Sequence, residues 1–278
     1  MAEPARLRSY YALMRGLFTA GYGVLGIRRE VTRENLANSF PELDRDRLRQ
    51  LEREHRVRLS ELAAEVLYAS RIEAAELRER VRLVNPELLA AAAPPRPIVL
   101  AAAHQCNFEW MLLRVSLELG EGLLALYKPM KNERAERAFQ RMRTRFGARI
   151  VPAKSVLKEL ARFREARALG VVADQVPRTS PEKHWLEFLG QDTAFYMGPE
   201  LLARALRSQV VYTRMRRLQR GRYEVEFVPL SAPGEKLPSG ELTARYAAAL
   251  EQDIRRDPAG WWWGHRRWKL KRAEAGGR

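Results

Sequence analysis

Short apolar runs alternate with amphipathic segments along most of the chain. Between residues 44 and 82, apolar side chains recur at steps of three and four among charged ones, which predicts a long charged helix. Uncharged runs too short for helices predict buried strands at residues 98–103, 148–151, 169–173, 209–213 and 223–228. Helical patterns separate them at residues 107–119, 133–146, 155–165 and 199–207. This alternation indicates an α/β fold whose mostly parallel or mixed central sheet is flanked by helices.

The chain reads as one domain with an N-terminal helical extension. Its 278 residues lie within the range of single α/β domains, and neither repeats nor a low-complexity linker divide them. Asn85-Pro86 and the proline cluster at residues 94–97 punctuate the pattern but do not mark a second domain. We therefore expect a segment at residues 1–30 followed by a single domain at residues 31–278.

The N-terminal segment contains an apolar stretch at residues 10–27. A membrane-spanning helix needs about 20 apolar residues, and Arg15 interrupts this stretch. Arginines also flank it on both sides, a pattern that suits a helix lying in an anionic membrane interface. A core helix that begins the domain is the alternative interpretation.

Composition excludes several classes of protein. With 46% hydrophobic residues the chain can bury a full core, so it is not a disordered tail. A net charge of +16 favours anionic partners: nucleic acid, an acidic membrane face, phosphorylated substrates or an acidic carrier protein. The single cysteine, Cys106, excludes an internal disulfide framework and any site with several cysteine ligands.

Polar side chains follow two of the predicted strands directly. His104 comes after residues 98–103 and Asp174 after residues 169–173, and reactive groups gather at the carboxyl ends of strands in open α/β sheets. If Asn107 caps the next helix, Glu109 lies in its first turn, near His104. Glu109 would then fix the imidazole tautomer and leave the other ring nitrogen as a general base. Cys106 is either a buried filler or a nucleophile.

Five segments in chain order carry a family resemblance. They lie at residues 31–42, 104–109, 127–129 with 143–147, 173–175 with Phe195 and Gly198, and 263–269. Together they resemble the late acyltransferases of lipid A biosynthesis, the lauroyl and myristoyl transferases. That family falls within the wider glycerol-phosphate-acyltransferase-like fold.

The resemblance implies acyl transfer from a thioester, on acyl carrier protein or coenzyme A, to a hydroxyl of a lipid acceptor such as a lipid A precursor. It also implies a place at the cytoplasmic face of the bacterial inner membrane, where the short, interrupted N-terminal stretch predicts a peripheral or monotopic position. We expect neither a metal nor a cofactor. His104 would be the general base and Glu109 its partner. Arg143 would steady a phosphate or carbonyl oxygen, and Asp174 would orient that arginine or the acceptor.

Further positions are expected to bind substrate: Asn107, Tyr127, Lys128, Gln175, Arg178 and Arg267. For Arg267 we expect the side chain to reach the acceptor's phosphate or the acidic donor carrier. The residue pattern by itself leaves alternatives open. Arg143 also fits the solvated face of a basic helix, Asp174 a turn, and Arg267 a purely structural charge.

Two other functions compete with this interpretation. Gln105-Cys106 and the interrupted N-terminal stretch depart from the family pattern, so a related enzyme that acylates another lipid, an amine or a carrier-bound metabolite fits equally well. Trp261–Trp263 beside arginines would suit single-stranded nucleic acid. No helix-turn-helix, RNA-recognition or zinc-finger pattern is present, so nucleic acid is not the expected partner.

Overall fold

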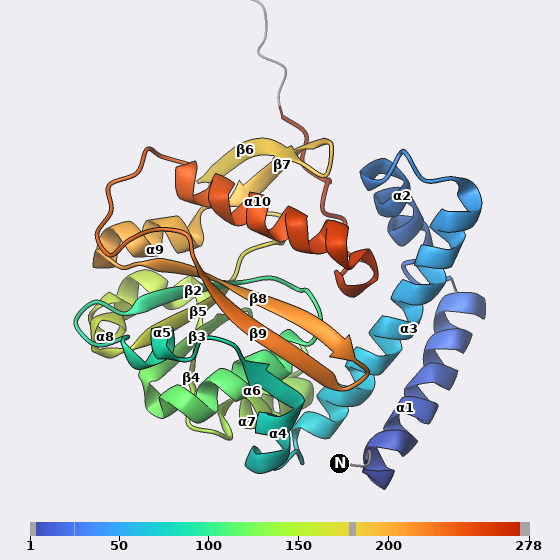
Figure 1. Ribbon diagram of the computed structural model, residues 1–278, viewed down its shortest axis with the longest axis horizontal. Coiled ribbons are helices and arrows are strands. Elements are labelled where there is room, and N and C mark those ends of the chain that lie inside the picture. The colour runs from blue at the N-terminus through green and yellow to red at the C-terminus, as the bar shows by residue number, and fades with distance from the viewer. Residues whose placement is uncertain (1–3, 25, 178–181, 273–278) are drawn as a thin grey trace, which may run out of the picture.

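A computed structural model describes residues 4–24, 26–177 and 182–272 (Figure 1). The strands in these ranges are β1 (Val81–Leu83), β2 (Ile98–Ala102), β3 (Leu123–Tyr127), β4 (Arg149–Pro152), β5 (Ala168–Val172), β6 (Lys183–Phe188), β7 (Gln191–Tyr196), β8 (Val210–Gln219) and β9 (Arg222–Pro229). The α-helices are α1 (Ala5–Phe18), α2 (Arg29–Ser39), α3 (Arg45–Ala69), α4 (Ala74–Arg80), α5 (Glu87–Ala90), α6 (Phe108–Leu119), α7 (Glu133–Thr144), α8 (Leu160–Glu165), α9 (Gly198–Leu206) and α10 (Glu241–Arg256). Shorter helical turns are η1 (Thr19–Val24), η2 (Gly120–Gly122), η3 (Ala153–Glu159) and η4 (Pro258–Gly260).

The central sheet is mixed, which confirms the expected fold class. Within the described residues its strands follow the order β1-β9-β8-β2-β5-β3-β4, while β6 and β7 form a separate hairpin. From β8 through β4 all neighbours are parallel, whereas β9 runs antiparallel to β8 and β1 runs parallel to β9. The carboxyl ends of β2, β5 and β3 therefore meet at the same edge of the sheet.

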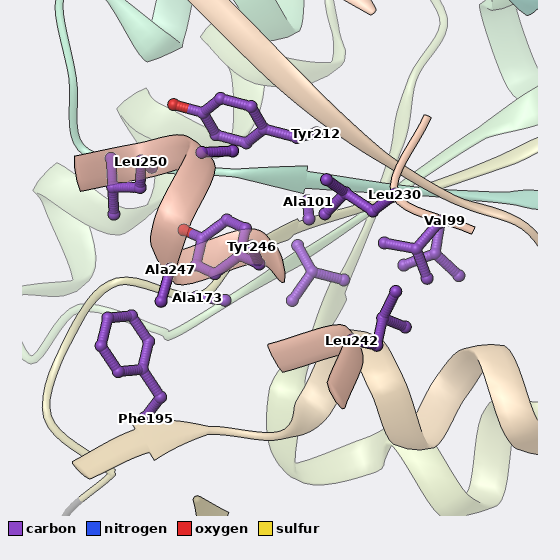
Figure 2. Packing of buried hydrophobic residues seen from close by; sticks show 14 of the residues in the cluster. Val99, Ala101, Ala173, Phe195, Tyr212, Leu230, Leu242, Tyr246, Ala247 and Leu250 are labelled. Carbon is purple, nitrogen blue, oxygen red and sulfur yellow. The ribbon is translucent and has the colours of Figure 1, made fainter. Parts of the chain in front are cut away.

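Strand β2 is buried on both faces, and its successive side chains belong alternately to two separate clusters of the hydrophobic core. Val99 and Ala101 pack with residues of α10, as Figure 2 shows. Leu100 and Ala102 point to the opposite face and pack with Trp110 and other residues of α6. Because successive strand residues face opposite sides, this uncharged run serves both layers, with α10 on one face of the sheet and α6 and α7 on the other (Figure 1).

The single long helix expected at residues 44–82 is in fact two helices separated by a break at residues 70–73. Asp44 begins α3 as predicted, because its side chain accepts a hydrogen bond from the backbone of Arg47 at 2.7 Å. The helix ends at Ala69, and α4 and the edge strand β1 follow. Ile72 and Leu77 lie fully buried after the break, so tertiary packing overrides a helical periodicity that the sequence continues.

A buried carboxylate joins the N-terminal helix to the rest of the domain. Glu65 of α3 accepts hydrogen bonds from Tyr11 of α1, Tyr223 of β9 and Asn107 at the start of α6, each at 2.7 Å. Burial raises the pKa of Glu65, and these three hydrogen bonds oppose that rise only in part. Helix α1 is thus tied, through one side chain, to the turn that follows β2.

In residues 4–24, 26–177 and 182–272, no helix is both long and apolar enough to cross a bilayer.

Candidate active site

The ends of two adjacent strands bring His104 and Asp174 into contact. Strands β2 and β5 are parallel partners with Ala102 opposite Val172, so the residues that follow them emerge side by side. The imidazole Nδ1 of His104 lies 2.6 Å from Oδ1 of Asp174, and the His104 backbone N–H donates to Oδ2 at 2.9 Å. Residues 70 positions apart in the chain thus form a bidentate contact.

Asp174 is held as a buried anion. The indole N–H of Trp261 donates to its Oδ2 at 2.8 Å, in addition to the two bonds from His104. Burial by itself would raise the pKa of Asp174, but the charge of His104 and these hydrogen bonds outweigh it and hold the pKa below its usual value. The carboxylate is therefore ionised and fixed in orientation.

The other ring nitrogen of His104, Nε2, is placed to accept a proton. When the Nδ1–H group donates a hydrogen bond to Asp174, Nε2 carries the free lone pair of the imidazole. The side-chain Nε2 of Gln175 lies 3.1 Å from it and donates an N–H. Burial would lower the pKa of His104, but the facing Asp174 carboxylate raises it above 6.5. An aspartate-oriented imidazole of this kind suits a general base.

Glu109 pairs with Arg143 and not with His104. Its two oxygens accept from Nε and Nη2 of Arg143 at 2.9 and 2.5 Å, a bidentate ion pair between the first turn of α6 and the last turn of α7. Burial would lower the pKa of Arg143, but its hydrogen bonds to Glu109 raise it. The guanidinium is therefore a permanent positive charge.

The predicted partnership of His104 with Glu109 is thus wrong, as is the expected orientation of Arg143 by Asp174. The prediction rested on spacing between residues of one strand–helix unit. The nearest carboxylate to His104 comes instead from the neighbouring strand, and the nearest carboxylate to Arg143 comes from the neighbouring helix. The observed pairs are therefore His104 with Asp174 and Arg143 with Glu109.

An apolar cavity lies beside these two pairs. Its volume is about 320 Å³, and His104, Glu109 and Arg143 line it together with Tyr127 and Gln175. Other parts of the lining come from α6, β3 and β5: Met111, Leu112, Val115, Leu123, Ala125 and Gly170. Since a water-sized group occupies about 30 Å³, this volume accommodates roughly ten methylene-sized groups.

The predicted binding residues fall into three groups. Tyr127, Lys128 and Gln175 line the cavity. Asn107 is fully buried outside its lining, where its Oδ1 caps α6 through Trp110 N at 2.9 Å and its amide donates to Glu65. The structure thus gives Asn107 a capping contact in place of the predicted substrate contact. Arg178 lies outside the described residues.

Arg267 does not reach a ligand as expected. Its exposed fraction is 2%, and its guanidinium lies over the ring of Phe195, 4.4 Å from the centroid. Its Nε and Nη2 have no hydrogen-bond acceptor among the described residues. Burial lowers the pKa of Arg267 to about 10, which the charge of Asp174 partly counteracts. The contact expected with a phosphate or a carrier protein is replaced by cation–π packing in the core.

Cys106 is not arranged as a nucleophile. Its backbone N–H donates to the carbonyl of Gly260 at 2.9 Å. Burial raises the pKa of its thiol to about 12, which leaves almost no thiolate at neutral pH. Over the described ranges, no group of three or more His, Cys, Asp or Glu side chains is placed to hold a metal ion.

Sequence reasoning missed Trp261 and the cavity walls. Trp261 was noted only as part of an aromatic run, although its indole fixes Asp174. The cavity wall on β3 was missed because the run at Leu123–Tyr127 was not recognised as a strand. The sequence does contain a signal for this strand, because Gly120 and Gly122 end the preceding helical pattern and an uncharged run follows.

Comparison with known proteins places this geometry in a family. Residues 13–270 match the family described as bacterial lipid A biosynthesis acyltransferase. No curated protein matches the chain. Among solved structures, the chain is similar to the 1-acyl-sn-glycerophosphate (LPA) acyltransferase PlsC from Thermotoga maritima, with 13% identity and a TM-score of 0.43 over 91% of this chain and 99% of that chain. The family match covers nearly all of the sequence, and the chain belongs to the bacterial lipid A biosynthesis acyltransferases.

Proposed function

We propose that this acyltransferase moves a fatty acyl group from a thioester donor to a hydroxyl of a membrane lipid, such as a lipid A precursor. The observation that carries the proposal is the Asp174–His104 pair, in which the aspartate holds an imidazole that lines an apolar cavity. A general base beside a hydrocarbon-sized cavity suits transfer of an acyl chain to an alcohol.

His104 acts as the general base in this proposal. Its Nε2 removes the hydroxyl proton of the acceptor while the oxygen attacks the thioester carbonyl carbon and forms the new C–O bond. The tetrahedral intermediate then collapses, the C–S bond breaks, and the imidazolium returns the proton to the departing thiolate. Asp174, ionised and bonded to Nδ1, stabilises the imidazolium between these two transfers.

Arg143, which also lines the cavity, stabilises negative charge in this proposal. Its Nε and Nη2 are held by Glu109, and Nη1 has no hydrogen bond to a described residue. A fixed guanidinium costs little reorganisation when the carbonyl oxygen becomes an anion. The same group suits a phosphate of the donor or the acceptor.

Basic side chains beside the cavity favour an anionic donor. Lys128, Lys131, Arg134 and Arg137 are exposed on the loop before α7 and on α7 itself. An acidic acyl carrier protein or the phosphate-bearing coenzyme A would be attracted to this surface. The thioester would then enter the cavity past Tyr127 and Lys128.

Residues 1–30 serve as the membrane-associating segment of the proposal, and residues 31–278 as the acyltransferase domain. On α1, Leu7 and Tyr11 are buried, whereas Leu13 and Leu17 are 53% and 54% exposed. Arg15 and other arginines are exposed nearby. Apolar side chains among basic ones support peripheral or monotopic attachment to an anionic surface, here the cytoplasmic face of the inner membrane.

The first test is loss of acyl transfer in His104→Ala. Removal of a general base typically lowers the rate by about 10²- to 10⁴-fold, and we expect that loss with thioester donor and lipid A precursor as substrates. His184→Ala is the matched control, because His184 lies on β6 outside the cavity lining and its loss should leave the rate nearly unchanged. A folded His104→Ala enzyme with wild-type turnover would rule out this role.

The second prediction concerns pH. Neutral His104 is the active form, and its pKa is raised above 6.5, so kcat/KM should fall on acidification with an inflection above that value. Asp174→Asn removes the charge that raises this pKa and leaves the burial that lowers it. The inflection should therefore move to lower pH while the maximal rate falls. An inflection that stays in place in Asp174→Asn contradicts the assignment.

A third prediction addresses donor length. Gly170 of β5 faces Ala125 of β3, and both line the cavity. An added Cβ at Gly170 would lie 3.7 Å from the Ala125 side chain, an ordinary contact, so Gly170→Ala should fold and shift donor preference slightly. Gly170→Val fills more of the cavity. Because the added carbon groups take the place of methylene groups of the acyl chain, this variant should favour donors shorter by about two to four carbons. Equal donor profiles for all three enzymes would refute the acyl site.

The fourth prediction tests membrane attachment. The protein should bind vesicles that contain anionic lipid and release from them at high salt, since each basic residue near the surface contributes about 1 kcal/mol. Leu17→Asp should weaken this binding. Leu218→Asp is the matched control, because Leu218 is equally exposed at 59% but lies on β8. Equal binding of both variants in a sedimentation assay would place attachment elsewhere.

A further inference from the structure

The three consecutive tryptophans have different environments. Trp261 and Trp263 are 2% and 0% exposed, and their rings meet edge to face at 4.7 Å. Their indole N–H groups donate to Asp174 and to the carbonyl of Pro258. Trp262 between them is 40% exposed. Its neighbours thus anchor the backbone, while its own large apolar ring faces solvent.

The exposed indole lies directly beside the proposed base. The backbone N–H of Trp262 donates to the carbonyl of His104 at 3.1 Å, and the two rings approach edge to face with 6.2 Å between centroids. A methyl group added at Gly264 would lie 3.6 Å from both the indole nitrogen and Cβ of Arg28. Gly264 therefore lies close to both Trp262 and the exposed Arg28.

His104 separates this indole from the apolar cavity. Phe108 contacts the imidazole at 4.9 Å and lines the cavity, as do Glu109 and Arg143. Trp262 is absent from that lining. The imidazole thus faces the cavity, which suits the acyl chain of the donor, and outside the cavity lining it contacts the aromatic ring of Trp262.

We infer that Trp262 is the positioning residue for the acceptor: its indole packs against the hydrocarbon that carries the acceptor's hydroxyl and presents that hydroxyl to His104. The inference rests on the proposed acyl transfer. An aromatic ring supplies a large rigid contact surface at low entropic cost. Here hydrogen bonds made by Trp261, by Trp263 and to the His104 carbonyl hold the backbone around Trp262, so the indole surface is fixed before the substrate arrives.

A two-substrate kinetic experiment tests this assignment. Initial rates of wild type and Trp262→Ala are measured with an acyl thioester donor and a lipid A precursor in detergent micelles, each substrate varied in turn. Loss of an aromatic contact worth about 1.4 kcal/mol raises KM about tenfold. We expect that rise for the acceptor, a donor KM within about twofold of wild type, and partial rescue in Trp262→Phe.

Controls separate positioning from a structural role. Trp185→Ala removes another partly exposed tryptophan, on β6 and outside the cavity lining, and should change neither KM. If Trp262→Ala unfolds at the assay temperature, Trp262→Leu is used in its place. An unchanged acceptor KM, an equal rise in both KM values, or a loss of vesicle binding in the Trp262 variant would each overturn the inference.

The outcome for wild type distinguishes this inference from the function on which it rests. Absence of transfer by the wild-type enzyme would overturn the proposed function and the role of Trp262 together. Transfer by the wild type with an unchanged acceptor KM in Trp262→Ala would overturn only the role of Trp262.

Discussion

The buried charge of Asp174 is the constraint around which the strand ends are arranged. A desolvated carboxylate is unfavourable unless donors surround it, and this one receives the side chain and the backbone of His104 and the indole of Trp261. Those donors come from the end of β2 and from the segment after η4, so satisfying one anion joins three distant parts of the chain. Removal of the His104 side chain would leave Asp174 buried with only the backbone N–H of that residue and the indole of Trp261 as donors, which is unfavourable for a buried charge.

The Asp174–His104 and Glu109–Arg143 pairs share no hydrogen bond, and their charges complement each other. Asp174 raises the basicity of His104, whereas Glu109 fixes a guanidinium that keeps its charge at all relevant pH values. In the proposed reaction the first pair moves a proton and the second meets developing negative charge. The two pairs also influence each other, because the charge of Glu109 raises the pKa of His104 and the charge of Arg143 lowers it.

The periphery of the domain is coupled to this centre through packing. Glu65 connects α1 with Asn107, the residue that caps α6 and follows the His104 turn. Helix α6 in turn carries Glu109 and much of the cavity wall. A segment proposed to lie on the membrane therefore shares hydrogen bonds with the helix that shapes the acyl site, and Gly264 lies close both to Trp262 and to Arg28 at the start of α2.

Local pattern alone determined the strand ends at His104 and Asp174, the helix that carries Glu109, and the mixed α/β class, because buried runs and caps are properties of neighbouring residues. The ordered motifs also indicated the family that the match over residues 13–270 establishes. Tertiary structure decided the partners: His104 with Asp174, Glu109 with Arg143, and Arg267 over Phe195 instead of a ligand. Strand order is set by packing across the whole sheet, so no spacing within one strand–helix unit reveals which carboxylate lies beside which base.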